Sequence, residues 1–235
     1  MITCVTDPAN ASAGDFDDLL ASAVRFQRLV PDAVLVGGTA AALHAGHRIS
    51  YDHVIADLGG RLEAVLDALD REGDWVTNRV TPGKIILGEL GGIETGLRQL
   101  IRRRPLETEQ ITVSSGPLTV PTLAEILRIK AFLVVKRNQA RDYLDVAALS
   151  DRIGAHEAAR VLAGIDDYYA DQAPDQGTVA MQVAQQLADP HPRDARVTGQ
   201  LPRYKGLDTR WQSWAQIVSV CREVAQLMLL GSEEV

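Results

Sequence analysis

The sequence has 235 residues, of which 46% are hydrophobic and 23% charged, so we expect a folded chain with a substantial core. A net charge of −7 argues against a protein that covers nucleic acid with its whole surface, although it permits a local basic strip. No run reaches ~18 uninterrupted apolar residues, and the first residues lack a signal-peptide pattern. We therefore expect a cytoplasmic protein without a membrane partner.

Helix and strand patterns alternate through the first part of the chain. Apolar spacing, glycine pairs and runs of helix formers predict a helix at 16–27, a strand at 33–36, a helix at 39–45, a strand at 49–58 and a helix at 62–69. Short β-type runs separated by Pro-Gly, Gly-Gly and Gly-Pro then predict strands at 75–80, 84–90, 93–100, 111–115 and 118–120.

The second part of the chain has only helical patterns. Thr122, followed three residues later by Glu125, forms a capping-box sequence at the start of the first of these helices. Further helices are predicted at 140–152, 155–163, 178–188 and 210–230. The sequence therefore predicts an α/β (α+β) fold, with an α/β domain at 1–121 and a helical domain at 122–235.

A glycine pair stands between a predicted strand and a predicted helix. In Gly37-Gly38-Thr39 the glycines allow a tight turn and a close approach of a ligand, and the start of the helix offers free N–H groups to an anion. A plain turn without a ligand explains the same residues. The motif alone does not decide between the two.

One lysine lies on an otherwise apolar helix face. Lys130 shares that face with leucines, valines and isoleucines, where an ammonium group is costly unless it has a partner. Asp142 and Asp145 are one turn apart on the next predicted helix. Either these groups belong to a binding site, or Lys130 forms a buried ion pair with Asp142 or Asp145 that joins the two helices.

A basic strip precedes the second part of the chain. It consists of Arg98, Arg102, Arg103 and Arg104, and it is explained equally well by a solvated loop and by a surface for RNA.

Together the motifs resemble the AbiEii/AbiGii-type toxins of the polymerase-β-like nucleotidyltransferase superfamily. The matching segments are Gly37-Gly38-Thr39-Ala40, Gly46-His47-Arg48-Ile49-Ser50-Tyr51-Asp52, Lys130-Ala131 and Arg141-Asp142-Tyr143-Leu144-Asp145. They occur in the order and spacing of that family, over residues 34–149. The resemblance implies a mixed sheet in the first domain and a helical domain that completes the active site.

The resemblance implies an enzyme that transfers a nucleotide from a nucleoside triphosphate (NTP) to RNA, notably the 3′ end of tRNA, with one or two Mg²⁺ ions. It also implies a toxin–antitoxin pair, in which a cognate antitoxin protein restrains the enzyme. The nucleotide-binding residues would be Gly37, Gly38, Thr39, Arg48, Ser50, Lys130 and Arg141. The catalytic residues would be Asp52, Lys130 and Asp145, with Asp52 holding metal and Asp145 completing the acidic centre or acting as a base.

The sequence departs from the family at one metal ligand. The family places a second acid two residues after Asp52, where this chain has Val54, which cannot bind a metal. Alternate residues of a strand face the same way, so His53 and Asp57 have the wrong parity to replace it. Glu94 on a later predicted strand is the candidate replacement.

Three functions therefore remain open. The first is an RNA-directed nucleotidyltransferase that uses Asp52, Asp145 and Glu94. The second is a degenerate nucleotidyltransferase fold that binds a nucleotide, RNA or protein without catalysis, as Val54 favours. The third is a small-molecule nucleotidyltransferase, which the acidic composition favours over an RNA-directed one.

Overall fold

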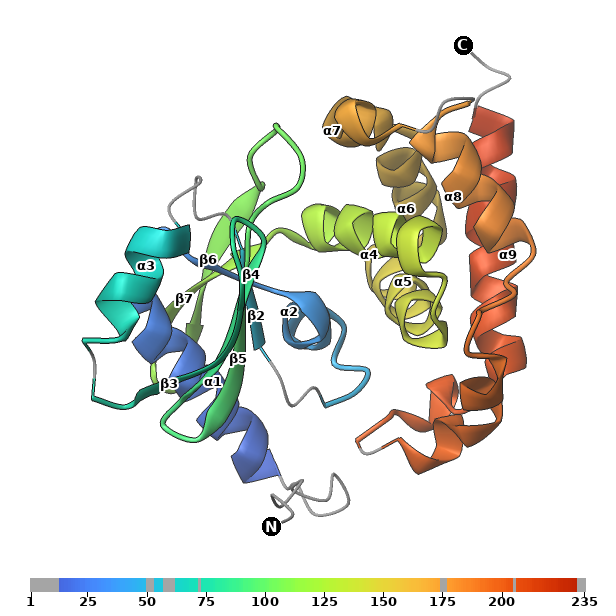
Figure 1. The fold of residues 1–235 in the computed structure, drawn as a ribbon. Helices are drawn as coiled ribbons and strands as arrows, with labels where there is room; N and C mark the ends of the chain where they lie inside the picture. The colour runs from blue at the N-terminus through green and yellow to red at the C-terminus, as the bar shows by residue number, and fades with distance from the viewer. Residues whose placement is uncertain are drawn as a thin grey trace.

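The computed structural model describes residues 13–49, 53–56, 62–71, 73–173, 177–204 and 206–231. Strands with two helices on one face form one half of the molecule, and a group of helices forms the other (Figure 1). This arrangement confirms the predicted α+β class. The predicted site residues Ser50 and Asp52 lie outside the described residues.

The larger sheet has five strands and is mixed. Its order is β1-β2-β5-β4-β3, in which β2 and β5 run parallel and the other neighbours are antiparallel. The strands are β1 (Val34–Val36), β2 (His53–Ala56), β3 (Trp75–Thr81), β4 (Ile85–Leu90) and β5 (Ile93–Arg98). A separate antiparallel hairpin consists of β6 (Thr108–Val113) and β7 (Gly116–Pro121).

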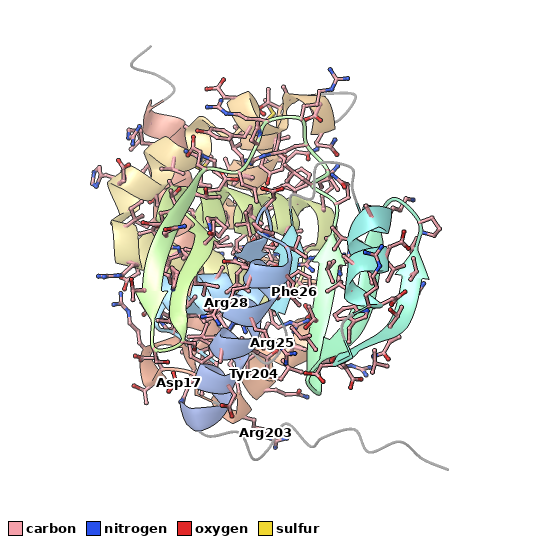
Figure 2. All side chains as sticks on the ribbon, turned by 90° about the vertical axis from the view of Figure 1, so that its left-hand side faces the viewer. Asp17, Arg25, Phe26, Arg28, Arg203 and Tyr204 are labelled. Carbon is pink, nitrogen blue, oxygen red and sulfur yellow. The ribbon has the colours of Figure 1, made fainter. Side chains whose placement is uncertain are left out.

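Helices α1 (Ala13–Leu29) and α3 (Leu62–Leu69) cover one face of the larger sheet. Phe26 of α1 is fully buried and meets Trp75 edge-to-face, with ring centroids 6.3 Å apart. Figure 2 shows α1 lying between the β6–β7 hairpin and the larger sheet. Gln27 fixes this position, because its side chain accepts from the N–H of Thr119 and donates to the carbonyl of Thr119, both at 2.8 Å.

The helical half is built around one apolar core. It contains α4 (Leu123–Arg137), α5 (Ala140–Ile153), α6 (Ala155–Ala163), α7 (Asp166–Tyr169), α8 (Val179–Ala188) and α9 (Trp214–Gly231), with short 3-10 turns between them. Helix α2 (Gly37–Ala45) contributes Ala40 and Ala41 to the same core. The predicted boundary at 121/122 lies between β7 and α4. The core of the helical half nevertheless includes residues of α2, which precedes this boundary in the sequence.

Several predicted elements differ from the observed ones. The strand predicted at 49–58 is observed as His53–Ala56, with Ile49 outside it, and helix α7 was not predicted. Strand β6 begins at Thr108 rather than 111, because its first three residues are polar and exposed and so give no apolar pattern, although they pair with β7. The last helix begins at Trp214 rather than 210, because the side chain of Asp208 accepts from the N–H of Arg210 and starts a separate 3-10 turn, Thr209–Trp211. None of the helices in the described ranges is long and apolar enough to cross a membrane.

Candidate functional site

A cavity of about 330 Å³ opens between the N-terminus of α2, helices α4 and α5, and the segment that joins β5 to β6. Its size is typical of a small-molecule site. The carboxylate of Asp142 lines it together with five basic side chains, Arg48, Arg98, Lys130, Arg137 and Arg141. Much of the remaining lining is apolar and includes Leu100, Ile101, Leu106, Ile129, Phe132 and Tyr169. The cavity is therefore suited to a ligand with an anionic end and an apolar end.

The predicted glycine turn lies at this cavity. Gly37 and Gly38 line it, and Gly37 has a φ of 81°, a backbone conformation that favours glycine. Val36, the N-cap of α2, is extended and gives no side-chain hydrogen bond to the helix. The N-terminus of α2 therefore faces the cavity without a side-chain cap from Val36, and the helix dipole favours an anion there.

Asp145 lies behind the cationic lining and is fully buried. Arg48 donates to both of its oxygens, from Nε at 2.8 Å and from Nη2 at 3.0 Å. Lys130 Nζ lies 2.6 Å from Oδ2, and His47 Nε2 lies 2.7 Å from Oδ1. Burial opposes ionisation, but the charges of Arg48 and Lys130 and the bond from His47 hold the pKa of Asp145 well below its ordinary value.

The contacts of Asp145 suit an anchor better than a base. A carboxylate with a strongly lowered pKa and donors on both oxygens is a weak proton acceptor at neutral pH. Asp145 instead orients Arg48 and Lys130, which both line the cavity. Its catalytic role stays a prediction.

Lys130 joins the two helices and also reaches the ligand space. Its side chain is almost fully buried, and Nζ lies 2.6 Å from Asp145 and 3.7 Å from Asp142. Asp142 in turn receives a bond of 2.8 Å from Arg137 Nη2. The predicted ion pair between α4 and α5 is therefore confirmed, and it does not exclude a binding role because Lys130 lines the cavity.

His47 is a neutral donor in this cluster. Burial lowers its pKa below 6.5, and this effect exceeds the raising effect of the hydrogen bond to Asp145. Because ionised Asp145 can only accept, we assign the ring hydrogen to Nε2. Nδ1 is buried without a hydrogen-bond partner among the described residues.

Several predicted residues lie elsewhere. The side chain of Thr39 is buried in α2 and does not line the cavity. Glu94 is exposed on β5 opposite Glu89 and does not line the cavity either. The backbone of Val54 on β2 lies opposite Val36 and Gly96.

The described residues do not make a metal centre by themselves. Across those ranges, no group of three or more His, Cys, Asp or Glu side chains could hold a metal ion. Both oxygens of Asp145 already face cationic donors. The predicted Mg²⁺ ligand Asp52 lies outside the described residues, so its role stays a prediction.

The predicted basic strip separates into residues with different roles. Arg98 lines the cavity, Arg102 is buried, and Arg103 and Arg104 are exposed. Arg137 was not predicted as a site residue, although it follows Lys130 by seven residues and so shares its helix face. The apolar segment after β5 carried no signal, because its position over the cavity depends on tertiary contacts.

The chain is similar to part of a group of longer proteins. It is 33% identical to the heme uptake protein MmpL11 of Mycobacterium tuberculosis over 247 residues, which cover 92% of this chain and 23% of that protein. It is 34% identical to the mycolic acid-containing lipids exporter MmpL11 of Mycolicibacterium smegmatis over 178 residues, which cover 75% of this chain and 16% of that protein. The chain thus spans less than a quarter of the length of these curated relatives.

No family model matches the chain, so the resemblance to the AbiEii/AbiGii toxins stays a prediction. The solution structure of the antibiotic-resistance factor ANT(2'')-Ia aligns with a TM-score of 0.50 and 12% identity over 68% of this chain and 96% of that chain. The crystal structure of ANT(2'')-Ia in complex with adenylyl-2''-tobramycin aligns with a TM-score of 0.50 and 10% identity, over 64% and 97%. ANT(2'')-Ia is a nucleotidyltransferase. At a sequence identity this low, the alignment shows a shared fold and not a shared activity. The chain has the nucleotidyltransferase fold.

Proposed function

We propose that the cavity is a nucleoside-triphosphate site and that this binding is the basic function of the chain. One observation carries the proposal: five basic side chains and the uncapped N-terminus of α2 converge on one cavity that also has an apolar wall. The nucleotidyltransferase fold supports the choice of a nucleotide over other amphipathic anions.

The two parts of the nucleotide match the two parts of the lining. The triphosphate would lie against Arg48, Lys130 and Arg141, where charge-assisted hydrogen bonds are strong because the site is partly buried. Asp145 keeps Arg48 and Lys130 in place and balances part of their charge before a ligand binds. The nucleoside would lie against the apolar wall that includes Leu106 and Tyr169.

Transfer of the bound nucleotide to RNA is the activity we propose to follow from this binding. As the resemblance implies, the acceptor would be the 3′ end of tRNA, and the protein would be a toxin that an antitoxin restrains. The metal would be Mg²⁺, held through Asp52 and Glu94. The exposed position of Glu94 gives this ligand set little support, so we derive no step through the metal.

Nucleotide binding without transfer is the second candidate. The valine at position 54 and the full set of donors around Asp145 favour it, because neither position supplies a free carboxylate. The third candidate, transfer to a small molecule, has a parallel in ANT(2'')-Ia, whose complex contains adenylyl-2''-tobramycin. Transport, named for the MmpL11 relatives, belongs to proteins in which the matched region is a minor part, and we do not propose it for this chain.

A transfer assay separates these candidates. The protein is incubated with each of the four labelled NTPs, Mg²⁺ and total tRNA, beside Asp52→Ala and the control Asp17→Ala, which removes an exposed carboxylate on α1. Labelled RNA that disappears in Asp52→Ala alone supports transfer. Nucleotide retention in equilibrium dialysis without labelled RNA supports binding alone, and no retention of any nucleotide contradicts the proposed site.

A gain-of-function variant tests the departure from the family. If Val54 alone weakens transfer, Val54→Asp should raise the rate of labelling. An unchanged rate would show that the missing second acid is not what limits this chain.

A further inference from the structure

The cavity lining divides into two groups of residues held by different contacts. On one side Lys130 links Asp142 and Asp145, and these carboxylates bring in Arg137 and Arg48, so the cationic residues form one cluster. On the other side Leu106 and Ile129 pack against Val36, and Phe132 stacks on Tyr169 with ring centroids 4.1 Å apart. The segment 99–107, between β5 and β6, supplies part of this apolar side through Leu100, Ile101 and Leu106.

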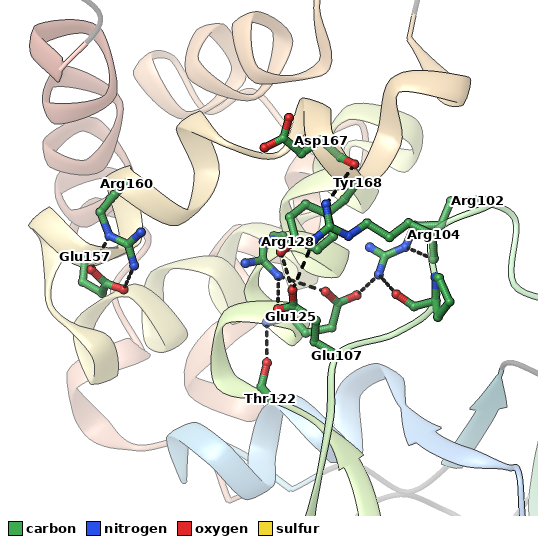
Figure 3. Close-up of polar contacts among 11 residues, drawn as sticks. Arg102, Arg104, Glu107, Thr122, Glu125, Arg128, Glu157, Arg160, Asp167 and Tyr168 are labelled. Carbon is green, nitrogen blue, oxygen red and sulfur yellow. Dashed lines mark hydrogen bonds and ion pairs between the residues drawn. The ribbon is translucent and has the colours of Figure 1, made fainter. Parts of the chain in front are cut away.

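The segment 99–107 contains little regular structure of its own, and one arginine holds it. The guanidinium of Arg102 is fully buried and donates to the backbone carbonyls of Arg104 at 2.9 Å and Pro105 at 3.0 Å. It also pairs with Glu125 in the first turn of α4 (Figure 3). The segment is thus folded around the side chain of Arg102 and fastened to the helix that carries Lys130.

The same arginine reaches the aromatic part of the wall. The Arg102 guanidinium lies 4.9 Å from the ring centroid of Tyr169, on the ring that also stacks with Phe132. Arg102 itself does not line the cavity, whereas Tyr169 and Phe132 do. Gln172 adds a bond of 3.0 Å from Nε2 to the carbonyl of Ile101.

A second set of contacts supports the ion pair between Arg102 and Glu125. Arg128 of α4 donates to Glu125 at 3.0 Å and to Glu107 at 2.8 Å, and its guanidinium lies 3.7 Å from the ring centroid of Tyr168. Figure 3 shows these side chains meeting from the segment 99–107, α4 and α7. Because buried ion pairs depend strongly on geometry, the pairing holds the segment in one position relative to α4.

We propose that Arg102 is a positioning residue for the nucleoside half of the proposed nucleotide site: it holds segment 99–107 against α4 and Tyr169 and so forms the apolar wall, without touching the ligand. The inference rests on the proposed function, because it assigns the apolar wall to the nucleoside and the cationic cluster to the phosphates. It therefore separates two ligands. Loss of Arg102 weakens a ligand that has a nucleoside and spares one that has phosphates only.

The test compares ATP with inorganic tripolyphosphate by isothermal titration calorimetry. Arg102→Gln is measured beside Arg103→Gln, which removes the same charge from the adjacent, exposed position. We expect Arg102→Gln to raise the Kd for ATP about tenfold and the Kd for tripolyphosphate less than about twofold relative to Arg103→Gln, because only the apolar contacts are lost. Glu125→Gln, which breaks the pair from the other side, should give the same division.

The other outcomes of this titration contradict either the role of Arg102 or the proposed nucleotide site. Equal ATP affinity in Arg102→Gln and Arg103→Gln overturns the positioning role. Equal weakening of both ligands in a folded variant also overturns it, because a merely structural role would do that. If the wild-type protein binds neither ligand, the proposed nucleotide site itself is wrong. Should Arg102→Gln fail to fold, Glu125→Gln and faster amide hydrogen exchange confined to 99–107 carry the decision.

Discussion

Two fully buried carboxylates, Asp145 on α5 and Glu125 on α4, are held by basic side chains but differ in electrostatic balance. Arg48, Lys130 and His47 supply donors to both oxygens of Asp145, and the pKa of Asp145 is well below its ordinary value. Glu125 has two arginine partners, yet burial dominates and raises its pKa. Burial alone therefore does not decide the charge of a carboxylate here, and the number and placement of donors do.

The difference separates a binding cluster from a packing cluster. Around Asp145, Arg48 and Lys130 both contact the carboxylate and also line the cavity, so this cluster can reach a ligand. Around Glu125, Arg102 and Arg128 do not line the cavity, and Arg128 is shared with a second carboxylate, Glu107. We expect the first cluster to dominate stability and phosphate binding, and the second to fix the apolar wall.

Asp145→Asn should have the largest effect on stability. It leaves the charges of Arg48 and Lys130 buried without their main partner, so we expect the free energy of unfolding to fall by about 3–5 kcal/mol. Urea denaturation measures the loss. The control is Asp151→Asn, which lies on α5 like Asp145 and forms a partly exposed pair with Arg210. This change should cost about 1 kcal/mol or less. Similar losses in both variants would contradict the role given to Asp145.

Glu125→Gln should destabilise less than Asp145→Asn. The raised pKa of Glu125 indicates that burial already disfavours its ionised form, so replacing this carboxylate by a neutral amide removes less electrostatic stabilisation. We expect a loss of about 1–3 kcal/mol in urea denaturation. A loss as large as that of Asp145→Asn would remove the contrast between the two clusters.

The stability contributed by neutral His47 should depend on pH. Its folded pKa is lowered by burial below 6.5, so the unfolded chain takes up a proton at higher pH than the folded protein. The contribution is complete above pH 6.5 and is lost as the pH falls toward the folded pKa, by at most ~1.4 kcal/mol per pH unit. Denaturation at several pH values between 7.5 and 5.5 should show a smaller decline for His47→Gln than for the wild type. Parallel declines would show that His47 does not titrate differently on folding.

The smallest expected effect concerns the start of α4. The hydroxyl of Thr122 accepts from the N–H of Glu125 at 3.2 Å and caps the helix. Thr122→Ala should lower the free energy of unfolding by about 1 kcal/mol, measured by urea denaturation. Ligand affinities should stay close to wild type, because Thr122 belongs neither to the cationic cluster nor to the apolar wall. A loss of ATP affinity would mean that the ligand site depends on the start of α4, which contradicts this expectation.

Local patterns predicted most of the fold. The strand, glycine turn and helix around Gly37, the N-cap at Thr122 and the helix face of Lys130 are all encoded within a few residues. The capping box forms only in part, because the N–H of Thr122 donates to the carbonyl of Glu107 and the Glu125 carboxylate pairs with arginines. Strand β6 and the start of α9 were misplaced, because exposed polar residues in a hairpin and a capped 3-10 turn carry no apolar periodicity.

The site was predictable in its cationic half only. The motif residues Arg48, Lys130 and Asp145 come together as their order suggested, across almost one hundred residues of sequence. The apolar wall was not predictable, because its position depends on Arg102, which looks in the sequence like one member of a solvated basic run. Glu94 does not line the cavity, because strand register places it opposite Glu89 at an exposed position, and its role as a metal ligand stays a prediction.

The most direct test of the central claim is calorimetric titration of ATP into the wild type, Arg141→Gln and Arg152→Gln. Both arginines are exposed on α5, but only Arg141 lines the cavity. A cationic phosphate site predicts a Kd raised about tenfold or more in Arg141→Gln and unchanged within about twofold in Arg152→Gln, since a charge-assisted hydrogen bond contributes ~1.5–3 kcal/mol. Equal affinities in the two variants, or no ATP binding by the wild type, would contradict the claim.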